Sequence, residues 1–220
     1  MDKDMPFAAQ SAAIFGEAWR LILASPLAVL LYLALMVGGA MLVDTNHWGE
    51  GADFAILAVD IGATFALTMI LIVEGVPGGR TGSKGFGTYF GLSFLTGLAI
   101  GAGFLLLIVP GLYLWARWAP AYGFALAEDM DVSTAMGQSW DATRGHVVPI
   151  LLAMLVPAAV SIAGTLAFLL VIDEHDAVSW PLALGGNALV YLGSVLSTAV
   201  GLAVFSLLAR SGGATAEVFE

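Results

Sequence analysis

Two opposite charges lie inside long apolar stretches of the chain and are the first residues that could do chemistry. Asp60 lies six residues into the apolar run that begins at Phe54, and Arg117 lies six residues into the run that begins at Gly111. At the helical rise of about 1.5 Å per residue, both would lie about 9 Å below the same membrane surface. A charge at that depth costs about 2.5–3.5 kcal/mol and usually finds a partner on another helix. We therefore predict an intramembrane ion pair between Asp60 and Arg117; the alternative is that each side chain reaches water or headgroups separately.

Histidine and carboxylate side chains gather in two polar loops, at residues 44–53 and 173–181. Imidazole and carboxylate groups can together bind a divalent ion, which makes His47, His175 and Asp173 weak metal candidates. Two solvated acidic loops explain the same residues, and we favour them. No Ser-His-Asp, HExxH or paired acid/base pattern is visible. We therefore expect a protein that is not an enzyme and needs no metal or other cofactor.

The composition is that of a membrane protein. Hydrophobic residues make up 60% of the 220 residues and charged residues 11%, whereas soluble domains have about 45–50% and about 25%. The net charge of −10, with seven scattered Lys and Arg residues, argues against nucleic acid as a partner. Cysteine is absent, which excludes disulfides and thiolate chemistry.

Apolar runs long enough to cross a bilayer predict an all-α, polytopic integral membrane protein with six transmembrane helices in one domain. We place the spans at about 21–43, 54–76, 90–109, 111–127, 147–172 and 182–209. Pro110 and Gly111 divide the third span from the fourth, since proline cannot donate the helical hydrogen bond and glycine accepts a reversal. Gly97 and Gly101 form a GxxxG motif that permits close helix contact.

Two further segments have apolar residues at helical spacing between polar ones, at about 7–20 and 131–145. This pattern predicts amphipathic helices that lie in the membrane interface. In the second of them we expect Trp140 in the headgroup region and Arg144 on lipid phosphate or on helix-end carbonyls.

The basic residues predict the orientation. Outside the spans they all fall on one side of the six-span arrangement: Lys3, Arg20, Arg80, Lys84, Arg144 and Arg210. The positive-inside rule then places both termini in the cytoplasm of a bacterial cell, with the protein in the inner membrane. A five-span alternative, in which the Pro-Gly segment is re-entrant, would move Arg144 and Arg210 outside.

A glycine-rich segment, PGGRTGSKGFG at residues 77–87, lies between the second and third spans. It lacks the GxxxxGK[ST] order and the preceding strand of a phosphate-binding loop. We interpret it as a cytoplasmic loop.

Two sequence motifs resemble a known family. The first has Pro110, Gly111, Tyr113, Arg117 and Trp118, and the second has Ser139, Trp140, Thr143, Arg144 and Gly145. Over about residues 105–155 the chain resembles the YciC-like bacterial membrane proteins and the membrane domain attached to some glycerophosphoryl diester phosphodiesterases. The resemblance implies a polytopic helical domain of undefined activity. We expect no phosphodiesterase activity, because the residues after the last predicted span leave no room for a soluble catalytic domain.

Two functions from different classes fit these features. The first, which we favour, is a non-enzymatic scaffold, regulator or partner-binding module of the membrane. The second is a small transporter or lipid-handling protein that uses Asp60 and Arg117. The two differ in whether those charges are sealed against each other or face a solvated cavity. The expected partners are the lipid bilayer with its phospholipid headgroups, another membrane protein, or a second copy of this chain in a homo-oligomer.

Overall fold

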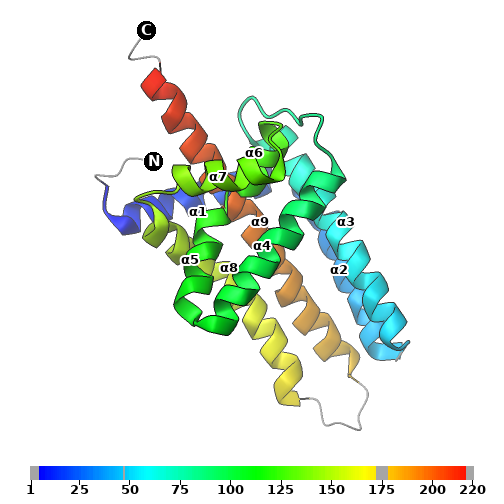
Figure 1. The fold of residues 1–220 in the computed structure, drawn as a ribbon. Coiled ribbons are helices and arrows are strands. Elements are labelled where there is room, and N and C mark those ends of the chain that lie inside the picture. Colours follow the sequence, from blue (N-terminus) through cyan, green and yellow to red (C-terminus); the bar gives the residue numbers. More distant parts are fainter. Residues whose placement is uncertain (1–4, 47, 172–177, 217–220) are drawn as a thin grey trace.

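A computed structural model describes residues 5–46, 48–171 and 178–216. These residues form nine helices and no strand (Figure 1). The helices are α1 (Phe7–Ala24), α2 (Pro26–Asn46), α3 (Glu50–Gly75), α4 (Phe86–Leu106), α5 (Ile108–Trp118), α6 (Ala121–Ala127), α7 (Val132–Ala142), α8 (Val147–Val171) and α9 (Trp180–Ala216). The all-α prediction is confirmed.

Five helices are long and apolar enough to cross a membrane. They are α2, most of α3 (Gly51–Gly75), α4, most of α8 (Val147–Leu169) and Trp180–Arg210 of α9. Their lengths of 21 to 31 residues exceed the roughly 20 residues that a hydrocarbon core requires. Several predicted spans therefore exist as helices, which supports a multispanning membrane protein.

The predicted fourth span, 111–127, is not one helix. The chain forms the short helices α5 and α6 instead, separated at Ala119 and Pro120. The break between α4 and α5 also differs from the prediction. It falls at Leu107 (φ −161°, ψ 145°) rather than at Pro110 and Gly111. Pro110 lies in the first turn of α5, where the missing N–H has no helical partner to lose.

Helices α4 and α5 form an antiparallel hairpin with an apolar tip (Figure 1). A Cβ atom on Gly103 would lie 2.9 Å from the Cα atom of Gly111, so only glycine allows the two helices to approach this closely. At the tip, Leu105 is 90% exposed and Leu106 78% exposed. Such a leucine-rich surface is stable in hydrocarbon rather than in water. By contrast, Gly97 and Gly101 make no close helix contact within the chain.

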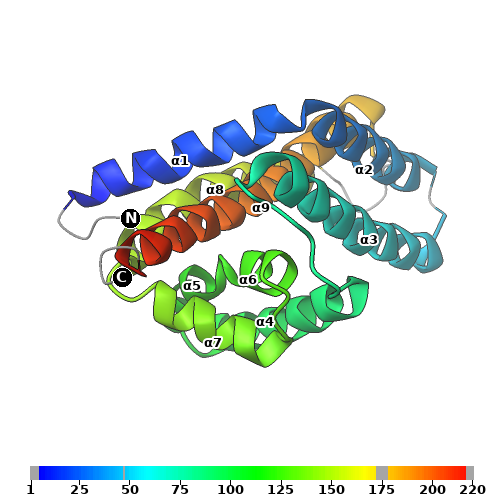
Figure 2. The same ribbon diagram turned by 90° about the horizontal axis from the view of Figure 1, so that it is seen from above.

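Helix α9 is the centre of the bundle (Figure 2). In the most apolar 18 residues of α9, 61% of the residues are buried, compared with 22% in the same stretch of α2, α3 and α4 and 33% in that of α8. It packs against α8, α2, α1 and α6. The other apolar helices expose most of their surface, as helices in contact with lipid do.

Helices α1 and α7 lie at one end of the bundle, where both ends of the described chain also lie (Figure 1). Pro26 begins α2 and so separates α1 from the first apolar span, which starts five residues later than predicted. Asp131 caps α7 by accepting a hydrogen bond from the Thr134 backbone N–H at 2.8 Å. Gly145 follows α7 with φ +85°, a conformation that glycine adopts at little cost.

Candidate functional site

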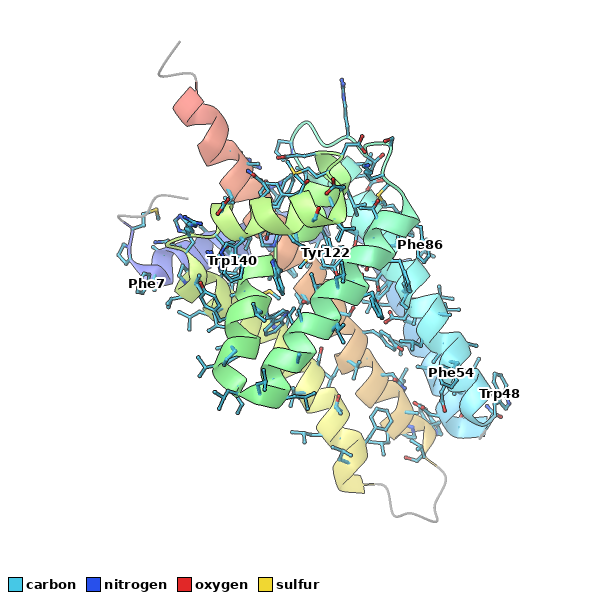
Figure 3. All side chains as sticks on the ribbon, viewed as in Figure 1. Phe7, Trp48, Phe54, Phe86, Tyr122 and Trp140 are labelled. Atoms are coloured by element: carbon cyan, nitrogen blue, oxygen red, sulfur yellow. The ribbon has the colours of Figure 1, made fainter. Side chains whose placement is uncertain are left out.

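A cavity of about 540 Å³ lies between α3, α4, α5, α6, α8 and α9. None of its 22 lining residues is charged, and ten carry a hydroxyl group. Tyr122, one of the ten, lies among α4, α6 and α9 (Figure 3). The ten are Thr64, Thr68, Tyr89, Ser93, Thr96, Tyr122, Ser161, Ser194, Ser197 and Thr198. The remaining wall is aromatic and aliphatic, with Trp115, Trp118 and Met154 among its members.

Some of these hydroxyl groups are bonded within the protein and others are not. The Tyr122 hydroxyl donates to Ser93 Oγ at 3.1 Å, and Thr96 Oγ1 donates to the Leu92 carbonyl oxygen at 2.7 Å. Ser197 and Thr198 have no hydrogen bond to any described residue, although both are half-buried in the cavity wall. These two hydroxyl groups therefore have donors and acceptors that no described residue uses.

The Asp60 carboxylate lies directly behind this wall. Its Oδ1 atom accepts hydrogen bonds from the Tyr32 hydroxyl (3.0 Å) and from Thr64 Oγ1 (3.2 Å). The Tyr32 oxygen also lies 3.1 Å from Ser194 Oγ. Thr64 and Ser194 both line the cavity. The network joins α2, α3 and α9, and one hydroxyl side chain separates the carboxylate from the cavity.

The predicted ion pair between Asp60 and Arg117 is wrong. Asp60 is bonded to hydroxyl groups, and none of the ion pairs among the described residues includes Arg117. The depths estimated for the two residues assumed a full span over 111–127. Because α5 has only 11 residues, it returns towards the end of the bundle that carries α7, and Arg117 in its last turn packs against α7 there.

The two sequence motifs meet around Arg117, which is 3% exposed. Its Nη1 atom donates to Thr143 Oγ1 at 3.1 Å, and its carbonyl oxygen accepts from Ser139 Oγ at 2.7 Å. Its guanidinium carbon lies 4.2 Å from the centre of the Trp140 ring and 5.6 Å from that of Tyr113. Within a buried site, contact with aromatic faces stabilises the positive charge. We call this group of five residues the Arg117 clasp.

The other motif residues lie around the clasp. The Trp118 and Trp140 rings are 6.0 Å apart, and Trp118 also lines the cavity, so Trp118 lies between the clasp and the cavity. Gly111 packs against Gly103 of α4. Arg144 is exposed and forms an ion pair with Asp141 at 2.9 Å. Trp140 is half-buried and its ring packs against Arg117 and Trp118; its position in the headgroup region stays a prediction.

At the end of the bundle that carries α1, the buried Glu17 forms an ion cluster with two exposed arginines, which we did not predict. Its carboxylate accepts two hydrogen bonds from Arg20 (2.7 and 2.9 Å) and one each from Ser206 and Arg210 (both 2.8 Å). Arg20 also donates to the Gly75 carbonyl oxygen at 2.8 Å. The cluster therefore joins α1 to the end of α3 and to α9. Its only sequence signal was the spacing of Glu17 and Arg20, three residues apart on one helix.

Two further polar contacts join helices that are far apart in the sequence. At the opposite end of the bundle, the Asn187 amide donates to Asp44 Oδ2 at 2.6 Å. His146 is buried, and its Nδ1 atom lies 2.8 Å from Gln10 Oε1. The metal candidates His47, His175 and Asp173 fall outside the described residues. Within the described ranges no group of three His, Asp or Glu residues could hold a metal ion.

No protein-family model matches the chain, and no curated protein or solved structure is similar to it. The cavity, the clasp and the ion cluster are therefore the features of the molecule that indicate a function.

Proposed function

We propose that this protein binds an uncharged amphipathic molecule, such as a neutral lipid, in the hydroxyl-lined cavity, and that it handles or transports this molecule within the membrane. The observation that carries the proposal is the cavity wall, in which ten hydroxyl side chains and several aromatic rings occur without a charged residue. Ligand sites are typically concave and mostly apolar, with a few polar groups that fix orientation. A charged ligand would find no counter-charge in this wall, whereas hydroxyl or ester groups would find donors and acceptors.

The volume agrees with this class of ligand, since small-molecule sites typically measure about 300–1,000 Å³. The cavity lies at the middle of α3, α8 and α9, three helices that are long enough to span a bilayer. A molecule that reaches it from the lipid phase would exchange hydrocarbon for a surface with the same apolar character and additional hydrogen bonds. In this arrangement Asp60 polarises Thr64 and Tyr32 from behind the wall.

The ligand-binding role predicts a specific effect of filling the cavity. Gly97 lines the cavity, and a Cβ atom there would meet no atom within 4 Å. We expect Gly97→Trp to fold normally and to lose the lipids or other small molecules that stay bound to the wild-type protein in detergent. Native mass spectrometry of the purified protein, followed by identification of the released molecules, measures this loss.

Gly101→Trp is the matched control. Gly101 lies one helical turn further along α4, also has no atom within 4 Å of a Cβ position, and does not line the cavity. We expect this variant to retain the same molecules as the wild type. Equal retention by both variants would refute binding in the cavity and favour the scaffold or regulatory function instead.

For the topology we propose that residues 78–87 and 131–145 are cytoplasmic and that 44–53 and 173–180 face the opposite side. This is supported by the basic residues outside the candidate spans, because Arg20, Arg80, Lys84 and Arg144 lie on α1, on the loop after α3 and just after α7, all at one end of the bundle. Trp48 lies at the other end (Figure 3). In this arrangement the α4–α5 hairpin enters and leaves from the cytoplasmic side, and both termini are cytoplasmic in a bacterial inner membrane.

Cysteine labelling tests this topology directly, because the natural chain has no cysteine. We expect a membrane-impermeant maleimide to label Trp48→Cys on intact spheroplasts and to label Gln138→Cys only after the membrane is permeabilised. Labelling of both positions from the same side would contradict the proposed arrangement.

A further inference from the structure

A second, smaller pocket lies at the basic end of the bundle, separate from the cavity in the membrane. It has a volume of about 190 Å³ and lies between the loop after α3, the end of α6 and residues 205–210 of α9. Its charged lining residues are Arg80, Arg210 and Glu128, and Val76 and Phe205 contribute apolar surface. The glycine-rich loop, to which the sequence assigned no ligand, thus forms one wall.

We propose that this pocket binds a phosphate group, and that Arg80 and Arg210 are its two cationic ligands. Guanidinium groups recognise phosphate oxygens through paired N–H donors, and such charge-assisted hydrogen bonds are stronger than neutral ones. The proposal is independent of the ligand in the membrane cavity. It assigns a recognition role to a loop whose sequence does not match a nucleotide-binding motif.

Arg80 is available for this role. It is exposed, and no described residue forms an ion pair or hydrogen bond with its side chain. Arg210 donates one hydrogen bond from Nη2 to Glu17, which leaves other donors of its guanidinium group unused by described residues. The Glu17 cluster holds Arg210 in place at the pocket wall, because Glu17 also binds Ser206 and Arg20.

The local charge is positive. Arg20 and Arg210 share the single carboxylate of Glu17, so this cluster keeps one positive charge, and Arg80 adds another beside Glu128. Glu128 is exposed, and partial desolvation beside the pocket raises the pKa of its carboxyl group above the ordinary value. No cation within ion-pair distance of Glu128 offsets this effect among the described residues. An anion in the pocket would be repelled by Glu128 and attracted by both arginines.

Two sources can supply such a group: the headgroup of an anionic phospholipid or free phosphate. Both would enter a pocket of this size. They are distinguished by measuring the melting temperature of the full-length protein under two conditions. The first compares nanodiscs of phosphatidylcholine with nanodiscs that also contain phosphatidylglycerol. The second adds inorganic phosphate to the phosphatidylcholine nanodiscs, with chloride at the same ionic strength as the reference.

We expect wild-type protein to be stabilised in at least one of these conditions. Arg80→Gln should bind the stabilising phosphate compound about tenfold more weakly, which is the loss expected for one charge-assisted hydrogen bond. Lys84→Gln is the matched control, because it removes a positive charge from the same loop without changing the pocket wall. Glu128→Gln should strengthen binding, since it removes the repulsive carboxylate.

Equal losses in Arg80→Gln and Lys84→Gln would show that only the general surface charge acts, and would overturn the proposal. The absence of stabilisation by both phosphatidylglycerol and inorganic phosphate would also overturn it. Stabilisation by phosphatidylglycerol alone identifies a lipid headgroup as the ligand, and stabilisation by inorganic phosphate alone identifies free phosphate. Neither result depends on whether Gly97→Trp loses the molecules bound in the membrane cavity.

Discussion

Replacing Trp140 by leucine is expected to lower the free energy of unfolding by about 2–3 kcal/mol, because it removes half-buried aromatic surface and the ring that stabilises the Arg117 charge. The guanidinium carbon lies 4.2 Å from the centre of this ring, and Arg117 is 3% exposed. Its Nε atom is buried without a hydrogen-bond partner. Among the described residues, the charge therefore depends on the Trp140 and Tyr113 rings and on one hydrogen bond, to Thr143. Unfolding in mixed micelles of increasing SDS content, followed by circular dichroism, measures the change.

A double-mutant cycle with Arg117→Met isolates the interaction from the effect of lost volume. We expect the loss of free energy of unfolding in the double variant to be smaller than the sum of the two single losses by about 1–2 kcal/mol. The reason is that each single substitution already removes the contact between the ring and the charge. Trp19→Leu is the control. Trp19 is 59% exposed on α1, so its replacement should change the free energy by less than about 0.5 kcal/mol. Additive losses at Trp140 and Arg117 would show that the ring does not stabilise the charge.

Replacing Glu17 by glutamine is expected to be the second most damaging change, with a loss of about 2 kcal/mol, the value of one hydrogen bond to a charged group. The Glu17 side chain is 9% exposed and accepts hydrogen bonds from two arginines and Ser206. A neutral amide would leave Arg20 and Arg210 without a counter-charge. The comparable substitution Asp141→Asn should have almost no effect, because both partners of the Asp141–Arg144 pair are about two-thirds exposed.

The same cluster predicts how stability depends on pH. The pKa of Glu17 lies below its ordinary value of 4.5, mainly because the carboxylate accepts hydrogen bonds from Arg20. A carboxyl group with a lowered pKa stabilises the folded state above the ordinary value, and this contribution is lost as the pH falls through the lowered pKa. The melting temperature of the wild type should therefore fall below about pH 4.5 more steeply than that of Glu17→Gln. Parallel curves for the two proteins would rule out this role.

The sequence by itself determined the helices and their class. Uninterrupted apolar runs must satisfy their backbone hydrogen bonds internally, so the stretches now seen as α2, α3, α4, α8 and α9 could only be helices in a membrane. Local chemistry also set three ends of the helices. Pro26 begins α2, Asp131 caps α7, and Gly145 ends the turn that follows it. These features depend on neighbours within a few residues, which the sequence shows directly.

The tertiary structure alone decided which polar groups meet. The charges of Asp60 and Arg117 were matched by sign and by a depth calculated from assumed spans, but depth does not specify which helices are adjacent. The hydroxyl groups of the cavity come from α3, α4, α6, α8 and α9, and no single helix carries enough of them to form a visible motif. Glu17 likewise gains Ser206 and Arg210 from a segment 189 and 193 residues away. Such sites arise from helix packing, which depends on the shapes of all the surfaces in contact rather than on any local pattern.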